Sequence, residues 1–416
     1  MIKSYPVATG LPLFPDHPPL SHCVRCGVCK SLCPTYSEDA REGMSARGRV
    51  MLLNKFTAGE IGRSAVLEDR IFSCMLCGAC DKLCPLGLSI SEGIYEGRRA
   101  LGRLSRKRRF IGYLTGILFA RISLGYKILK IIETLGEILP VYRMPPLNIL
   151  RRLDVKMSDK PLNTGQTVSR VPGARGRIAL FSGCTVNFLY PDMGRALISS
   201  LNAMRYDVIL PKGEACCGAP LMSAGLADEA AQLARRNISF FKKLKVEAVI
   251  SLCPTCVHVI SHQYRRMVGE GISAVDVSRF FSDRLPDFPA EQLSIMNYQP
   301  KVICHDPCHS LYCLDVKKEP RKILKSLGMR LLDSEGGCCG FGGSFRLFYS
   351  KMSEAILADR VRDYKEADMI VTSCPNCVLH LKSGMKGKQV KHIIEIIAEA
   401  LQGDKNEKKR QKKHQT

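Results

Sequence analysis

The chain has 416 residues, more than one hydrophobic core usually serves, so two or three domains are expected. Its formal net charge is +23, but no nucleic-acid-binding motif accompanies the basic runs. Twenty cysteines cluster in CxxC spacings, which in a chain of this length favours metal ligation over a disulfide scaffold.

The first 20 residues contain five prolines and Asp16, so they lack the apolar core of a signal peptide. The longest uncharged apolar stretch, residues 110–120, is about half of what a bilayer crossing requires. These features predict a cytoplasmic protein. Peripheral contact with the inner face of the cell membrane stays open because of the basic residues at 98–109.

Residues 1–100 hold two cysteine clusters, and the stretch between them has helical apolar spacing at Val50, Leu53 and Phe56. We expect short helices and loops here. Apolar residues at helical intervals predict one or two amphipathic helices over residues 111–139, and with the basic residues before them they form an amphipathic segment over residues 98–139. A helix lying on an anionic membrane and an ordinary helix packed between domains fit this pattern equally. Prolines and glycines then indicate a linker over residues 156–176.

The motif CxxCxxCxxxCP occurs twice before residue 90. Three thiolates at intervals of three on a tight loop can face three irons of one 4Fe-4S cube, and in two-cluster ferredoxins the fourth cysteine serves the other cube. Gly27 and Gly78 suit a loop whose amides approach a cluster without a Cβ in the way. The prolines after the fourth cysteines turn the chain outward. The predicted ligand sets are Cys23, Cys26, Cys29 and Cys84 for the first cluster, and Cys33, Cys74, Cys77 and Cys80 for the second.

Zinc is the main alternative at these motifs, since CxxC also serves tetrahedral zinc. Zinc sites usually pair two CxxC units, whereas here three cysteines in series precede a fourth that is followed by proline. Disulfides are expected even less in a reducing compartment. The spacing therefore favours two 4Fe-4S clusters.

The rest of the chain contains a sequence repeat in two copies. The first copy runs from residue 177 to 256 and the second from 301 to 377, and each contains a CCG motif and a CPxC motif. Short β-branched runs alternate with helical patterns at 227–244 and 353–364, which predicts βαβ units on a parallel sheet. The cysteines follow the strands, at the edge where open α/β sheets place their ligands.

Each copy offers five cysteines, more than one zinc ion needs, and its adjacent cysteine pair can supply two corners of a polynuclear site. The sets are Cys184, Cys216, Cys217, Cys253 and Cys256 in the first copy, and Cys308, Cys338, Cys339, Cys374 and Cys377 in the second. Two interpretations stay open: the sets bind further iron-sulfur clusters, or the cysteines pack as small hydrophobes. Cys304 is an alternative to Cys308 as the first ligand, and Cys313 has no assigned role.

His305 and His309 flank Cys308, and a hydrogen bond from either to a cluster sulfur or thiolate would tune a reduction potential. The plainer interpretation, which we favour, makes them and Asp306 polar residues at a strand end. The chain contains no GxGxxG after a strand and no phosphate-binding GxxxxGK[ST]. Any flavin or nicotinamide is therefore expected on another subunit.

These motifs, together with the segment SARGR at residues 45–49, resemble the iron-sulfur subunit of glycolate oxidase and its relatives among FAD-linked 2-hydroxyacid dehydrogenases. The paired CCG units also resemble the catalytic subunit of heterodisulfide reductase, where such cysteines are associated with noncubane 4Fe-4S clusters. The resemblance implies an FAD-binding oxidase subunit that oxidises glycolate, D-lactate or another 2-hydroxy acid. This chain would pass the electrons through two 4Fe-4S clusters toward a quinone or other membrane acceptor, with little activity alone.

Two other functions stay open: a disulfide-reducing catalytic subunit that works at a CCG cluster, and a structural metal protein. The predicted fold is mixed, with an α-helical dicluster ferredoxin domain followed by two tandem α/β cysteine-rich domains with parallel sheets. The expected boundaries are 1–100 for the dicluster domain, 101–172 for the amphipathic segment and linker, 173–295 and 296–402 for the cysteine-rich domains, and 403–416 for a disordered basic tail.

Overall fold

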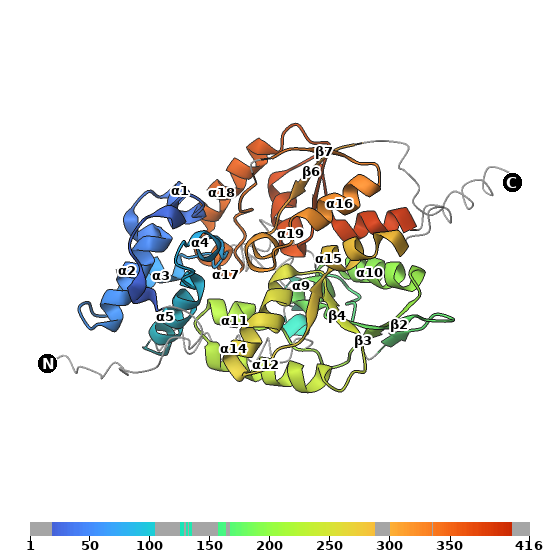
Figure 1. Cartoon of the computed structure of the whole chain (residues 1–416), viewed down its shortest axis with the longest axis horizontal. Coiled ribbons are helices and arrows are strands. Elements are labelled where there is room, and N and C mark those ends of the chain that lie inside the picture. The colour runs from blue at the N-terminus through green and yellow to red at the C-terminus, as the bar shows by residue number, and fades with distance from the viewer. Residues whose placement is uncertain are drawn as a thin grey trace. The chain divides into compact units, whose positions relative to one another are not determined.

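The computed structural model describes residues 19–104, 125–128, 130–131, 133–134, 157–163, 167–287, 300–334 and 336–401. The predicted tail at 403–416 lies outside the described residues. The chain divides into two compact units (Figure 1). The first comprises Met1–Gly116, Pro220–Ala230 and Gly340–Ile356, and the second comprises Ile117–Ala219, Ala231–Cys339 and Leu357–Thr416.

The described part of the first unit is helical, as its apolar spacing predicts. Its N-terminal elements are η1 (Leu20–His22), η2 (Val28–Lys30), α1 (Pro34–Glu38), η3 (Glu42–Met44), α2 (Ala46–Thr57), α3 (Ala65–Phe72), α4 (Ala79–Leu83) and α5 (Ile90–Leu104). Later segments complete it with most of α11 (Ala219–Ser223), α17 (Ser344–Phe348), and the first parts of α12 (Ala227–Phe241) and α18 (Ser350–Asp363).

The core of the first unit forms where α2, α3 and α5 meet. The helix predicted from Val50, Leu53 and Phe56 is α2, and all three side chains are buried in this core with Ile71 of α3 and Ile94 of α5. Several of the predicted cluster ligands pack against it: Cys23, Cys74, Cys80 and Cys84. Apolar burial therefore anchors the cysteine loops.

The second unit contains two sheets. Its strands are β1 (Thr167–Ser169), β2 (Gly176–Leu180), β3 (Tyr206–Leu210), β4 (Ala248–Ser251), β5 (Ala274–Asp276), β6 (Lys301–His305), β7 (Arg330–Leu332), β8 (Met369–Thr372) and β9 (Gln389–His392). The orders are β1-β3-β2-β4-β5 and β7-β6-β8-β9. All of these strands except β1 pair in parallel, so the predicted parallel α/β character is confirmed. The order β3-β2-β4-β5 repeats as β7-β6-β8-β9, and the sequence repeat is thus a repeat of structure.

Strand β1 departs from the sequence prediction. It lies inside the stretch 156–176, for which the prolines and glycines predict a linker, and it pairs antiparallel with β3, with Val168 opposite Ile209. A three-residue edge strand shows no periodicity in the sequence, so only its pairing with β3 reveals it. One antiparallel edge strand on an otherwise parallel sheet is common.

Helices connect the strands of the second unit. They are α9 (Gly183–Phe188), α10 (Pro191–Ala203), α13 (Pro254–His258), η5 (Val259–Gln263), α14 (Tyr264–Val268), α15 (Val277–Asp283), η6 (Leu285–Asp287), η8 (His309–Cys313), α16 (Lys318–Ser326) and α19 (Pro375–Gly384), followed by a helix over residues 393–401. The helical patterns at 227–244 and 353–364 correspond to α12 and α18.

Only parts of the predicted amphipathic segment, residues 98–139, are described, and these parts are helical. Tyr126 stacks on Phe188 of α9 with ring centroids 4.8 Å apart, and Lys130 pairs with Glu133. The first contact joins the segment to α9, as in a helix packed on the protein, and the second lies within the segment. The rest of the segment lies outside the described residues. Across the described chain, no helix has the length and apolar content needed to cross a bilayer.

Candidate metal centres

The two CxxCxxC loops share an unusual backbone path. In the first loop Arg25 and Gly27 have φ angles of 60° and 85°, and in the second Leu76 and Gly78 have φ angles of 57° and 79°. Glycine adopts these left-handed angles without strain, whereas Arg25 and Leu76 are held there by the surrounding structure. Successive N–H groups in such turns point to one side and form a concave site for an anion. The sequence reveals the glycines but gives no sign of the two strained residues.

Each loop borders a hollow lined by cysteines of both motifs. One hollow is lined by Cys23, Cys26, Cys29 and Cys84. The other is lined by five cysteines: Cys33, Cys74, Cys77, Cys80 and also Cys29. Each hollow thus contains one predicted set of four, with three cysteines from one loop and one that follows the other loop.

Prolines mark the ends of the two loops. Cys33 is the extended N-cap residue of α1, and Pro34 takes the first helical position, where a missing N–H is tolerated. Cys84 follows α4 as its C-cap residue, and Pro85 lines the first hollow beside it. Helix boundaries therefore place both fourth cysteines.

The segment at residues 45–49 supports the first loop. Ser45 caps α2, since its Oγ accepts a hydrogen bond from the third helical N–H at 2.9 Å. Arg47 donates to the carbonyl of Arg25 at 3.0 Å and pairs with Glu42. The guanidinium of Arg47 lowers the pKa of the Glu42 carboxyl to about 2. The resemblance singles out this segment, and the structure shows that it fixes the backbone of a cysteine loop.

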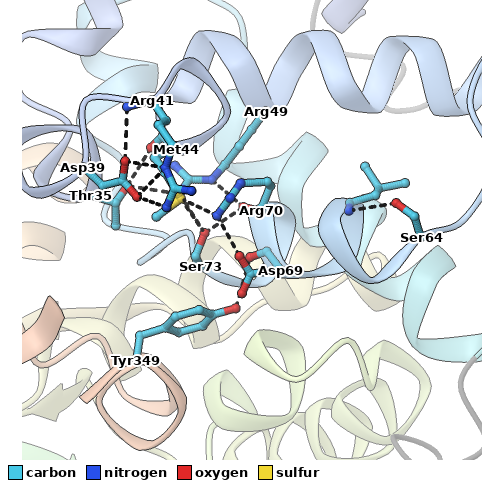
Figure 2. Close-up of polar contacts among 11 residues, drawn as sticks. Thr35, Asp39, Arg41, Met44, Arg49, Ser64, Asp69, Arg70, Ser73 and Tyr349 are labelled. Carbon is cyan, nitrogen blue, oxygen red and sulfur yellow. Dashed lines mark hydrogen bonds and ion pairs between the residues drawn. The ribbon is translucent and has the colours of Figure 1, made fainter. Parts of the chain in front are cut away.

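Arg49 is a buried cation beside the second hollow. The residue is 1% exposed, and Figure 2 shows it among its polar partners. It donates to the Arg70 carbonyl at 2.7 Å and to the Thr35 and Ser73 hydroxyls at 3.1 and 3.0 Å, and its Nη1 lies 4.0 Å from Sγ of Cys33. In the described part of the chain no carboxylate pairs with it. Burying an unpaired guanidinium is unfavourable, so the arrangement favours an anionic group in the hollow.

A second buried cation, Arg98 of α5, holds the backbone that enters the second cysteine loop. It is 1% exposed and donates to the carbonyls of Ile71, Phe72 and Cys74. It also donates to the Ser223 carbonyl at 2.9 Å. Burial lowers the pKa of Arg98. Although Arg98 opens the basic run at 98–109, it is internal and does not face a partner or a membrane.

Two thiols in these hollows resist ionisation in the protein alone. Burial raises the pKa of Cys29 and of Cys80, and neighbouring cysteines add to the increase at both. Iron binds the thiolate, so the metal and nearby positive groups must offset this penalty. Four converging sulfurs, inward N–H groups and an arginine without a carboxylate partner among the described residues together fit a 4Fe-4S cluster.

The cysteines of each repeat gather at the carboxyl ends of the parallel strands, where the sequence predicts them. In both repeats the second cysteine of the CC pair contacts the last cysteine of CPxC, and the first contacts the cysteine that follows the first strand. The Sγ atoms are 3.5 Å apart in Cys217–Cys256 and 3.4 Å apart in Cys339–Cys377. The other pairs are Cys184–Cys216 and Cys308–Cys338. Such convergence favours a polynuclear site over scattered packing.

The two five-cysteine sets meet each other. The thiol of Cys253 lies against that of Cys374, so the ten sulfurs form one continuous group. The residue after the first cysteine of each repeat bonds to a residue inside the CPxC motif of the other repeat. The pairs are Thr185 with Asn376 at 2.8 Å, and His309 with Thr255 at 3.0 Å.

Glu214 is a site residue that the cysteine motifs do not reveal. Its buried carboxylate accepts hydrogen bonds from the N–H groups of Ser182 and Gly183, at 3.0 and 2.7 Å, just before Cys184. Burial raises the pKa of Glu214 to about 7. An acidic residue two places before the CC pair is the signal that could have drawn attention to it.

The neighbours of Cys308 have different roles. Asp306 pairs with Arg321 at 2.6 Å, as suits a polar residue at a strand end. Cys304 lies inside β6, where burial raises its pKa to about 12. Cys308 rather than Cys304 contacts the CC pair, and Cys313 ends the turn η8 without an assigned role.

Comparison with known families identifies both regions. Residues 19–88 match the family described as a 4Fe-4S dicluster domain, and residues 178–261 and 302–382 match the cysteine-rich domain. The chain is therefore an iron-sulfur protein that joins a dicluster domain to two cysteine-rich domains, and 4Fe-4S clusters are its cofactors.

Individual relatives support a redox role at modest identity. The chain is 27% identical to the probable glycolate oxidase iron-sulfur subunit of Bacillus subtilis, over 92% of this chain and 95% of that protein. It is 28% identical to a subunit of the fumarate reductase (CoM/CoB) of Methanothermobacter marburgensis, over 94% of this chain and 74% of that protein. It is 26% identical to a subunit of the dihydromethanophenazine:CoB–CoM heterodisulfide reductase of Methanosarcina barkeri, over 92% of this chain and 94% of that protein. The predicted resemblance to glycolate oxidase and heterodisulfide reductase subunits is confirmed.

Proposed function

We propose that this chain is the electron-transfer subunit of a glycolate, D-lactate or related 2-hydroxyacid oxidase. An FAD-containing partner oxidises the 2-hydroxy acid to the 2-oxo acid, and the two electrons leave one at a time through this chain toward a quinone or another membrane acceptor. The observation that carries the proposal is the pair of hollows, each lined by a predicted set of four cysteines. The similarity to a glycolate oxidase iron-sulfur subunit supports the substrate class.

The proposed ligands are Cys23, Cys26, Cys29 and Cys84 for one cluster, and Cys33, Cys74, Cys77 and Cys80 for the other. When bound, the clusters supply groups that take up and release one electron each. Arg49 and the inward N–H groups stabilise the negative charge that the second hollow holds. Arg47 keeps the first loop in its strained path.

Approach to a membrane acceptor is part of the proposal. The net charge of +23 attracts the chain to anionic surfaces, and the basic run at 98–109 contributes to it. Arg98 is internal and Arg99 pairs with Glu96, so neither of these two arginines is left to meet an anionic partner.

Anaerobic purification of the tagged chain from its host tests the proposal. We expect an FAD protein to copurify, and glycolate or D-lactate to reduce the iron-sulfur signal measured by electron paramagnetic resonance. A Cys26→Ala, Cys77→Ala double variant is the control, since it keeps the surface of the cysteine-rich domains but lacks one ligand in each hollow. Copurified flavoprotein that leaves the signal of the unaltered chain oxidised would contradict the proposal.

Disulfide reduction is the second candidate, and one specific observation favours it. The ten thiols of the cysteine-rich repeats form one group through Cys253 and Cys374, which suits chemistry that needs two metal centres side by side. The similarity to a heterodisulfide reductase subunit points the same way. Release of thiols from a heterodisulfide by the reduced, anaerobic chain, without any response to 2-hydroxy acids, would select this function.

A further inference from the structure

His305, the last residue of β6, places a buried imidazole beside the second cysteine set. The residue is 1% exposed. One of its ring nitrogens and the Sγ atoms of Cys339 and Cys377 all lie within 4.8 Å of one another. A nitrogen and two sulfurs at this spacing are ligand atoms that iron and other transition metals accept.

Tyr364 decides which nitrogen is available. Its hydroxyl lies 2.7 Å from Nδ1 of His305, and the two rings meet edge to face with centroids 5.9 Å apart. The other nitrogen, Nε2, is buried and lies on the side of the ring that contacts the Cys339 thiol. A metal-bound histidine produces this pattern, with one nitrogen on the metal and the other hydrogen-bonded to the protein.

The first repeat lacks this imidazole. Three residues before the first cysteine, Phe181 takes the place of His305. Phe181 packs against Phe241, with ring centroids 5.6 Å apart. Because β2 and β6 hold the same position in their sheets, the difference lies in the side chain and not in the topology. The two five-cysteine sets are therefore chemically distinct.

We propose that Nε2 of His305 is an iron ligand in the centre held by the second cysteine set, and that Tyr364 orients its ring. The inference requires iron in the second cysteine set and does not depend on the 2-hydroxyacid substrate of the proposed function. A neutral imidazole binds iron without the negative charge that a thiolate at the same corner would add.

Nitrogen hyperfine spectroscopy of the full-length chain, purified anaerobically with ¹⁵N-labelled histidine, tests this ligand. A bound imidazole gives a coupling to the paramagnetic iron that changes with the isotope. His305→Phe introduces the first repeat's own residue, and we expect the coupling to disappear. His380, which also lies against Cys339, provides the matched control. His380→Val introduces the residue found at position 259 in the first repeat, and we expect the coupling to persist.

A second variant covers the case in which His305→Phe does not fold. His305→Cys offers a thiolate at the same corner, so iron content should be kept while the nitrogen coupling is lost and the potential falls. Absence of coupling in the unaltered chain, its persistence in the His305 variants, or its loss in His380→Val would overturn the proposal. Failure of the proposed function would give a different result: the Cys26→Ala, Cys77→Ala variant would hold as much iron as the unaltered chain.

Discussion

Arg49 carries its charge at a position that water does not reach, and its hydrogen bonds go to uncharged groups. A cluster bound by four thiolates is anionic, so it supplies the negative charge that would pair with the Arg49 guanidinium. The same cation interacts more strongly with the reduced cluster, which carries one more negative charge. Arg49 should therefore raise the reduction potential of the cluster in the second hollow.

The variant Arg49→Met removes this charge from the buried site. We expect the potential of one cluster to fall by on the order of 1–2 kcal/mol, which is about 40–90 mV for a one-electron couple. A redox titration followed by electron paramagnetic resonance measures the shift. Arg41→Met removes an exposed arginine that pairs with Asp39 and serves as the control. Equal shifts in the two variants would contradict the role of Arg49.

His392 of β9 is a buried residue whose charge state affects stability. Its Nε2 donates to the Leu252 carbonyl at 3.1 Å and its Nδ1 accepts from the Ile394 N–H at 3.2 Å, so only the neutral ring satisfies both bonds. Burial lowers the pKa of His392 to about 4. In the unfolded chain the ring takes up a proton near pH 6.5.

The free energy of unfolding should consequently fall as the pH drops from 7.5 to 5.5, because His392 takes up a proton in the unfolded state but stays neutral in the folded state. For His392 this amounts to about 1 kcal/mol at pH 5.5. His392→Gln should lose less stability across this window, as measured by denaturant unfolding at both pH values. His22→Gln changes an exposed histidine and is the control. A loss as large in His392→Gln as in the unaltered chain would refute the assignment.

Among the elements, the cysteine loops depend most on single backbone angles. Gly27 has φ +85°, and a Cβ there would lie 3.1 Å from Nη1 of Arg47, the side chain that holds the loop. Left-handed φ costs other residues roughly 1–2 kcal/mol. Both the left-handed backbone angle and the close approach of Arg47 therefore favour glycine at position 27.

Gly27→Ala should lower both the stability and the iron content of the purified protein. Gly59→Ala is a matched control, because Gly59 has φ +75° and a Cβ added there would meet no atom within 4 Å. It should show a similar loss of stability, about 1 kcal/mol, with unchanged iron. Thermal unfolding and iron analysis of both variants separate the two effects. Normal iron in Gly27→Ala would show that the loop tolerates a side chain.

Sequence patterns predict those elements whose signal is local. The helix around Val50, the parallel strands and the grouping of cysteines at strand ends all follow from spacing. Features that depend on distant partners do not. Strand β1 forms by pairing with β3. Arg98 is held by a hydrogen bond to Ser223, and the imidazole of His305 is oriented by a hydrogen bond with Tyr364. Residues that are close in space but far apart in sequence leave no periodic signal.

In the whole molecule, compact units and sequence order do not coincide. The first unit contains the dicluster region and also the segments Pro220–Ala230 and Gly340–Ile356, each of which follows a CC pair. Tyr349 in the second of these segments donates to the Asp69 carbonyl at 3.1 Å (Figure 2). The domain boundaries near residues 100, 173 and 296 stay predictions.

The function of the whole chain depends on two interlocked sets of four cysteines, each holding a 4Fe-4S cluster. Iron and acid-labile sulfide should be measured in the anaerobically purified chain and in its Cys26→Ala, Cys77→Ala variant. We expect the unaltered chain to hold about eight iron and eight sulfide more than the variant. Equal contents in the two proteins, or zinc in place of iron, would rule out this pair of clusters.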